Sequence, residues 1–177
     1  MSYKRLFIWV EGDDDLRFFD RIIKPRAQRQ YDLVEIITYA EMKKNKIDKY
    51  IKSINGMGAD YIYIRDINEA PCVTFRRDRI KEKYEILDEK NIVVVIKKIE
   101  GWYLAGIHDE NATRLKMRKI RKYINTDMID KGQFNTLMPR RFDSRIDFMI
   151  EILKSFSIET AKRKNKSFNY FVEKYKL

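Results

Sequence analysis

The feature that most constrains the fold is a short apolar run near the N-terminus, residues 6–10, that passes directly into a helical pattern. An unbroken apolar run with β-branched and aromatic residues is typical of a strand buried on both faces in a parallel sheet. The apolar residues of segment 16–23 instead recur at helical spacing, and the aspartates at 13–15 suit a first helical turn. Glu11 therefore lies at the carboxyl end of a central strand, where open α/β sheets bind their ligands.

The rest of the first hundred residues alternates between strand-like and helical patterns. Further strands are predicted at residues 33–39, 60–66 and 91–99, and helices at residues 16–23, 41–54 and 73–86, with Pro25 ending the first helix. This order predicts an α/β fold with a four-stranded, mainly parallel sheet flanked by helices. Past residue 106 only helices are predicted, at residues 114–124, 129–134, 143–156 and 168–176. We therefore expect an α/β domain at residues 1–106 and a basic helical extension at residues 107–177.

Composition narrows the class of partner. The net charge of +11 favours an anionic polymer such as DNA or RNA, although a lysine-rich composition alone could also produce it. No apolar run approaches the roughly 20 residues that a membrane span needs. The N-terminal segment also lacks the apolar region of a signal peptide. We expect a cytoplasmic protein with no membrane partner.

Cysteine and histidine are too scarce to build a soft metal site. The chain has one cysteine, Cys72, and one histidine, His108, which excludes an internal disulfide framework and a site rich in cysteine or histidine. Any bound metal would be held mainly by oxygen atoms, which favours Mg²⁺ or Mn²⁺.

Acidic side chains follow three of the predicted strands. Glu11 ends the first, Asp66 the third and Glu100 the fourth. Parallel strands would bring these ends to one edge of the sheet, where the repulsion between carboxylates is relieved by a hard cation. Such a cation polarises a phosphoryl group and lowers the pKa of bound water. The pattern therefore predicts a shared acidic site suited to phosphoryl transfer.

Three segments resemble the motifs of the TOPRIM domain, and the resemblance is nearest to small proteins of the overcoming-lysogenization-defect (OLD) nuclease type. VEGDDD at residues 10–15 resembles the first motif, a hydrophobic strand ending in Glu-Gly with an Asp four residues after the Glu. Asp66-Ile67-Asn68 resembles the second motif, Asp-x-Asp, with an amide in place of the second acid. KIEGWYLAG at residues 98–106 resembles the last acidic motif of OLD-type proteins.

The resemblance implies a TOPRIM or Rossmann-like fold and a metal-dependent nuclease. It implies catalytic and metal-binding roles for Glu11, Asp66 and Glu100, with Asn68 as a neutral oxygen ligand. Gly12 and Asp15 would support the site. Because Asn68 removes one negative charge, tight binding of a second metal ion is in doubt. OLD-type TOPRIM domains are usually fused to an ATPase, and no Walker A motif is present here, so an ATPase partner protein is a further expectation.

Each of these acids also has a purely structural interpretation. Glu11 could accept hydrogen bonds from helix N-terminal amides, and Asp15 could serve as a first-turn acid. Asp66 could open a turn, and Glu100 could cap the helix beginning near Gly101. These alternatives stay open at the level of sequence.

Basic residues cluster in the predicted extension. The candidate nucleic-acid contacts are Arg114, Lys116, Arg118, Lys119, Arg121, Lys122, Arg140 and Arg141. Such residues would bind phosphates without reading sequence, and the affinity would fall with salt. The alternative is a solvated face whose long side chains cover apolar surface.

The sequence thus predicts a magnesium- or manganese-dependent nuclease acting on DNA, or on RNA. The alternatives are a nucleic-acid-binding module without catalysis and a subunit that is active only with an ATPase partner. The oligomeric state is not predicted.

Overall fold

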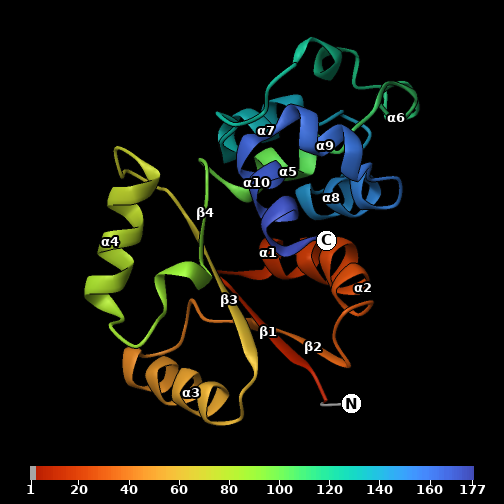
Figure 1. Cartoon of the computed structure of the whole chain (residues 1–177). Helices are drawn as coiled ribbons and strands as arrows, with labels where there is room; N and C mark the ends of the chain where they lie inside the picture. The colour runs from red at the N-terminus through yellow and green to blue at the C-terminus, as the bar shows by residue number, and fades with distance from the viewer. Residues whose placement is uncertain (1–2) are drawn as a thin grey trace. The chain divides into compact units, whose positions relative to one another are not determined.

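The computed structural model describes residues 3–177, and these contain a four-stranded parallel sheet with helices (Figure 1). The strands are β1 (Arg5–Val10), β2 (Leu33–Thr38), β3 (Asp60–Asp66) and β4 (Ile92–Val95), in the order β2-β1-β3-β4. In the central ladder, Val10 on β1 lies opposite Thr38 on β2, and Trp9 lies opposite Tyr63 on β3. The predicted α/β class with a four-stranded parallel sheet is confirmed.

The chain divides into two compact units, one reaching to Val94 and one spanning Val95–Lys176. The helices of the first unit are α1 (Asp13–Phe18), the π-helical segment η1 (Phe19–Ile23), α2 (Lys24–Ala27), α3 (Lys44–Gly56), α4 (Val73–Lys83) and the short 3₁₀ helix η2 (Glu89–Asn91). Those of the second are α5 (Ile99–Ala105), α6 (Asp109–Arg114), the 3₁₀ helix η3 (Arg118–Lys122), α7 (Lys131–Leu137), α8 (Arg145–Leu153), α9 (Ile158–Lys164) and α10 (Lys166–Tyr175). The division places α5 in the second unit, whereas the sequence-based boundary at residue 106 placed it in the first.

The first unit buries both faces of its sheet, as the continuous apolar strands require. Side chains alternate along a strand, so Trp9 faces the layer formed by α3 and α4 while Ile8 and Val10 face the opposite side. Trp9, Tyr63 and Ile51 of α3 belong to one buried cluster and are 0% exposed. Figure 1 shows α3 and α4 on one side of the sheet and α1 and α2 on the other.

The first helical region continues past the proline that was expected to end it. Helix α1 passes into the π-helical η1 and then into α2, in which Pro25 occupies the first turn. A proline ring in an α-helix clashes with the carbonyl four residues earlier, and the wider π turn before Pro25 relieves that contact. The predicted end at Pro25 is therefore wrong, and the helical region closes at Ala27.

The fourth strand is shorter than the sequence predicts. The predicted strand at residues 91–99 is β4, which ends at Val95, and α5 begins at Ile99. Between them Lys97 adopts a left-handed conformation with φ 58°, which breaks the extended backbone. Glu100 accordingly lies in the first turn of α5 instead of at a strand end.

The predicted basic helix at residues 114–124 is also interrupted. Helix α6 ends at Arg114 and a separate 3₁₀ helix, η3, covers Arg118–Lys122. Lys116 between them has φ 58°, and the like charges along this segment disfavour a continuous helix. No helix within residues 3–177 has both the length and the apolar character needed to cross a membrane.

The second unit is built around α5, which is buried along its whole length. The indole Nε1 of Trp102 donates a hydrogen bond of 2.8 Å to the hydroxyl of Ser167, and its ring packs edge-on against Phe168 with centroids 5.1 Å apart. The same hydroxyl accepts the backbone N–H of Ile96 at 3.3 Å. The C-terminal α10 is thereby fixed to both the start and the centre of this unit.

Candidate functional site

Two predicted acids lie at one edge of the parallel sheet in the first unit. Glu11 follows β1 and Asp66 ends β3, and these strands pair in parallel, so both carboxylates lie at the same strand-end edge. Asp66 is 8% exposed, whereas the side chain of Glu11 is 33% exposed. This edge is the position at which open α/β sheets bind ligands.

Arg65 forms an ion pair with Glu11 at this edge. Its Nε lies 3.6 Å from Oε2 of Glu11, and its guanidinium lies 5.7 Å from the centroid of the Tyr39 ring. Glu11 Oε2 is itself buried and makes no hydrogen bond within the described part of the chain. The pair is therefore an electrostatic contact without a hydrogen bond, which leaves this oxygen able to bind another partner.

The aromatic side chains behind Arg65 hold it in place and keep it charged. Tyr39 stacks on Tyr63 with centroids 4.6 Å apart, and its hydroxyl donates to the Ile64 carbonyl at 2.6 Å. Burial, with a contribution from Tyr63, raises the pKa of Tyr39 well above its ordinary value, so this phenol stays neutral. Burial opposes the charge on Arg65, but Tyr39 and Glu11 outweigh it and raise the pKa of Arg65 above its usual range.

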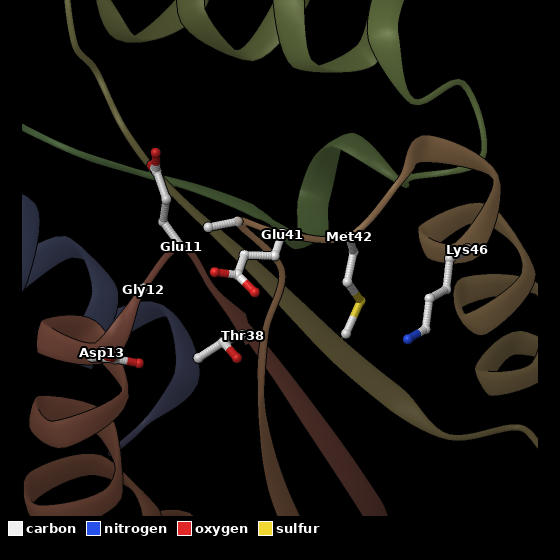
Figure 2. Close-up of a pocket in the computed structure, with 8 residues that line it drawn as sticks. Glu11, Gly12, Asp13, Thr38, Glu41, Met42 and Lys46 are labelled. Carbon is white, nitrogen blue, oxygen red and sulfur yellow. The ribbon is translucent and has the colours of Figure 1, made fainter.

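A pocket of about 520 Å³ opens at this edge beside Glu11 (Figure 2). Its wall continues from the end of β1 to the end of β2. The lining residues are Glu11, Gly12, Asp13, Thr38, Ala40, Glu41, Met42 and Lys46. Figure 2 shows the Glu11 carboxylate pointing away from those of Asp13 and Glu41. The pocket thus offers oxygen donors from two neighbouring strands without crowding them at one point.

Gly12 and Asp15 have a local structural role. Gly12 is the N-cap of α1, and its backbone N–H donates to Oδ2 of Asp15 at 3.3 Å. Asp14 forms an ion pair of 2.8 Å with Arg17 one turn later. These contacts agree with the interpretation of the aspartates as helix-start residues. The predicted support of the acidic site by Gly12 and Asp15 stays a prediction.

Asn68 lies in the loop after β3 in a left-handed conformation with φ 50°. Asparagine tolerates this conformation better than most residues because its short side chain can bond locally. Arg76 on α4 donates from Nε to the backbone carbonyl of Asp66 at 2.9 Å, which ties the end of β3 to the helix that follows. The loop that carries Asp66 and Asn68 is therefore anchored to the rigid part of the unit.

Glu100 belongs to the second unit and has a partner there. It is 3% exposed, and its Oε1 accepts a hydrogen bond of 2.8 Å from Nη1 of Arg145 on α8. A buried carboxylate needs such a partner. Its predicted role as metal ligand stays a prediction, and the ion pair with Arg145 gives this carboxylate a structural role that sequence did not indicate.

The predicted nucleic-acid contacts differ in their surroundings. Arg114 pairs with Glu151 and donates to the Ser155 hydroxyl at 2.9 Å, and Arg121 donates to the Asp109 carbonyl at 3.2 Å. The guanidinium of Arg141 covers the ring of Phe142 at 4.7 Å. The exposed side chains include Lys116, Lys119, Lys122 and Arg140. The side chain of Arg118 lies outside the described ones.

The site includes residues that sequence analysis did not select. Thr38 ends β2 and Glu41 follows it. The strand-end argument used for β1 and β3 would have indicated both if residue 41 had not been assigned to a helix. Helix α3 starts only at Lys44. Arg65 immediately precedes Asp66, but its pairing with Glu11 on the neighbouring strand has no signal in a single sequence.

The oxygen donors at this edge fit a hard divalent ion. Mg²⁺ commonly uses one or two protein carboxylates and completes its shell with water and substrate phosphates. Glu11 and Asp66 can supply those carboxylates, and the buried Oε2 of Glu11 has no hydrogen bond to lose within the described residues. Over residues 3–177 there is no group of three or more Asp, Glu, His or Cys side chains placed to hold a metal ion.

Comparison with known proteins identifies a similar fold. No protein-family profile matches the chain, and no curated protein matches it. Among solved structures, the C-terminal region of the OLD protein from Xanthomonas campestris pv. campestris is similar, with a TM-score of 0.53 and 15% sequence identity. The match covers 99% of this chain and 95% of that one. The two chains share a fold over nearly their whole lengths.

Proposed function

We propose that this protein is a divalent-metal-dependent nuclease that hydrolyses phosphodiester bonds in DNA, or in RNA. The observation that carries the proposal is the placement of Glu11 and Asp66 at the same edge of a parallel sheet. The TOPRIM-like motifs at these positions and the fold shared with an OLD C-terminal region support it.

In this proposal Glu11 and Asp66 hold Mg²⁺ or Mn²⁺, with Asn68 as a further oxygen ligand. When bound, the ion would stabilise negative charge on the phosphoryl oxygens and lower the pKa of its bound water. Glu11 also serves as general acid or base, because its side chain is partly exposed and it lines the pocket. Asp15 supports the segment that carries Glu11 through its hydrogen bond with Gly12.

In the proposed site, Arg65 and the metal ion compete for the carboxylate of Glu11. Arg65→Gln is expected to lower the Mg²⁺ concentration for half-maximal cleavage by about three- to tenfold, because one positive charge leaves the site. Cleavage rate against Mg²⁺ concentration measures the effect. Arg29→Gln, which removes an exposed charge elsewhere in the same unit, is the control and should leave the midpoint unchanged. A higher midpoint in Arg65→Gln would contradict competition.

The proposed function is tested by incubating the full chain with end-labelled single- and double-stranded DNA and RNA in Mg²⁺, Mn²⁺ or EDTA. Cleavage of at least one polymer in the metals and none in EDTA is expected. Metal-independent cleavage, or no cleavage of any polymer with either metal, would contradict the proposal.

A nucleic-acid-binding module without catalysis is the second candidate. Asn68 favours it, since the second acid of the Asp-x-Asp motif is replaced by an amide that carries no charge. It predicts binding that persists in Glu11→Gln and no cleavage under any condition. If cleavage appears only when an ATPase from the same organism is added, the chain acts as a subunit of a larger enzyme.

A further inference from the structure

A second pocket, of about 350 Å³, lies within the second unit and joins two basic segments that are separate in sequence. Lys116 and Lys119 come from the segment between α6 and the end of η3, and Arg140 follows α7. Three cationic side chains therefore surround one opening, which we call the basic pocket.

The described side chains do not neutralise the cations of the basic pocket. No ion pair joins Lys116, Lys119 or Arg140 to a carboxylate among the described side chains. Other cations of this unit are paired, such as Arg114 with Glu151. No acidic residue lines the basic pocket. Three uncompensated like charges at one site repel each other, and an anion would relieve that repulsion.

The remaining wall of the basic pocket is mostly apolar. Met117 and Ile120 are buried beneath it, while three side chains at the end of α7 are half-buried. The apolar lining consists of Met117, Ile120, Leu137, Met138 and Pro139, and Thr136 adds a hydroxyl. An apolar surface bordered by cations suits a ligand with one flat, weakly polar part and one anionic part.

The backbone that places Lys116 is strained. Lys116 adopts φ 58°, a conformation that costs about 1–2 kcal/mol for a residue with a Cβ atom. The turn is held by hydrogen bonds from the Lys116 and Met117 N–H groups to the carbonyls of Thr113 and Ala112, at 3.0 and 2.8 Å. These two hydrogen bonds form the C-terminal cap of α6, and they fix the direction in which Lys116 leaves the helix.

We propose that the basic pocket binds one nucleotide of a single-stranded nucleic acid. Lys116, Lys119 and Arg140 contact the backbone phosphates, and the face of an unstacked base lies on the apolar wall. A duplex offers phosphates but keeps its base faces stacked, so it cannot use that wall. The choice of a nucleic acid over other phosphorylated ligands rests on the proposed nuclease function.

The test measures binding of a fluorescein-labelled 12-residue oligothymidylate to the full chain by anisotropy in EDTA. The pocket variant combines Lys116→Gln, Lys119→Gln and Arg140→Gln. The control variant combines Lys131→Gln, Arg163→Gln and Lys166→Gln, which removes the same charge from exposed positions of the same unit that do not line the pocket.

The pocket variant should bind about thirtyfold more weakly and the control variant less than about threefold. The slope of log affinity against log salt should fall by about 2 in the pocket variant, since each lost phosphate contact on a single strand removes about 0.7. Equal losses in the two variants would overturn the proposal, because general electrostatic attraction would then explain the binding.

A second comparison tests the apolar wall. Wild type should prefer the oligothymidylate over an abasic strand of the same length by about fivefold, and Leu137→Ala with Met138→Ala should remove that preference without changing the salt slope. Equal affinity of wild type for the abasic strand, or tighter binding of a duplex, would overturn the proposal. Because binding is measured in EDTA, this result is independent of whether the chain cleaves its ligand.

Discussion

Replacing Glu11 with glutamine is expected to lower metal-dependent cleavage by about a thousandfold or more, which is the largest effect on activity that we predict. The substitution keeps the size of the side chain and removes the charge that would bind the metal at the end of β1. Stability should change by less than about 1 kcal/mol, because the ion pair with Arg65 is long and partly solvated.

The matched control is Glu35→Gln. Glu35 is an exposed carboxylate on β2, in the same sheet but away from the strand ends. Single-turnover cleavage and thermal unfolding should be measured for both variants. Loss of cleavage in Glu11→Gln alone, with both proteins folded, is the expected result. Cleavage by Glu11→Gln at the wild-type rate would show that the catalytic site lies elsewhere.

Truncation of Trp102 to alanine should produce the largest loss of stability. The side chain is fully buried and packs against Phe168 and Phe171, with ring centroids 5.1 and 5.4 Å away. The cavity left behind and the lost burial of the indole should together lower the free energy of unfolding by about 3–5 kcal/mol. Denaturant unfolding, followed by circular dichroism, measures the loss.

Two conservative variants separate the contributions of Trp102. Trp102→Phe keeps most of the ring but removes the indole donor to Ser167, and Ser167→Ala removes the acceptor. Each should cost about 1–3 kcal/mol, less than the truncation. A truncation that costs no more than Ser167→Ala would contradict a packing role for the indole.

The sheet could be predicted from sequence because its strands are defined by local signals. The apolar run before Glu11 and the run that ends at Asp66 have the length and residue types of buried strands, and helical patterns separate them. Both became neighbouring parallel strands, β1 and β3. The acidic edge therefore follows from the order of elements alone.

Two of the errors arose where the backbone adopts a positive φ value at a lysine. Lys97 and Lys116 both adopt left-handed conformations, which shorten the fourth strand and interrupt the predicted basic helix. Lysine has no special preference for this region, so its sequence gives no warning.

The contacts of charged side chains were equally invisible in sequence. Arg65 pairs with Glu11 across neighbouring strands, and Arg145 reaches Glu100 from 45 residues away. Such pairings depend on register and packing, which one sequence does not specify. The basic pocket illustrates the same limit, since Lys119 and Arg140 lie in segments that are separate in sequence and yet line one cavity.

Mn²⁺ binding, followed by electron paramagnetic resonance of the free ion during titration, tests whether Glu11 and Asp66 form the metal site. We expect wild type to bind Mn²⁺ through Glu11 and Asp66, and the double variant Glu11→Gln with Asp66→Asn to bind at least about a hundredfold more weakly. Both proteins should first be shown to unfold cooperatively at similar temperatures. Equal binding by wild type and the double variant would contradict the assignment of the metal site to this edge of the sheet.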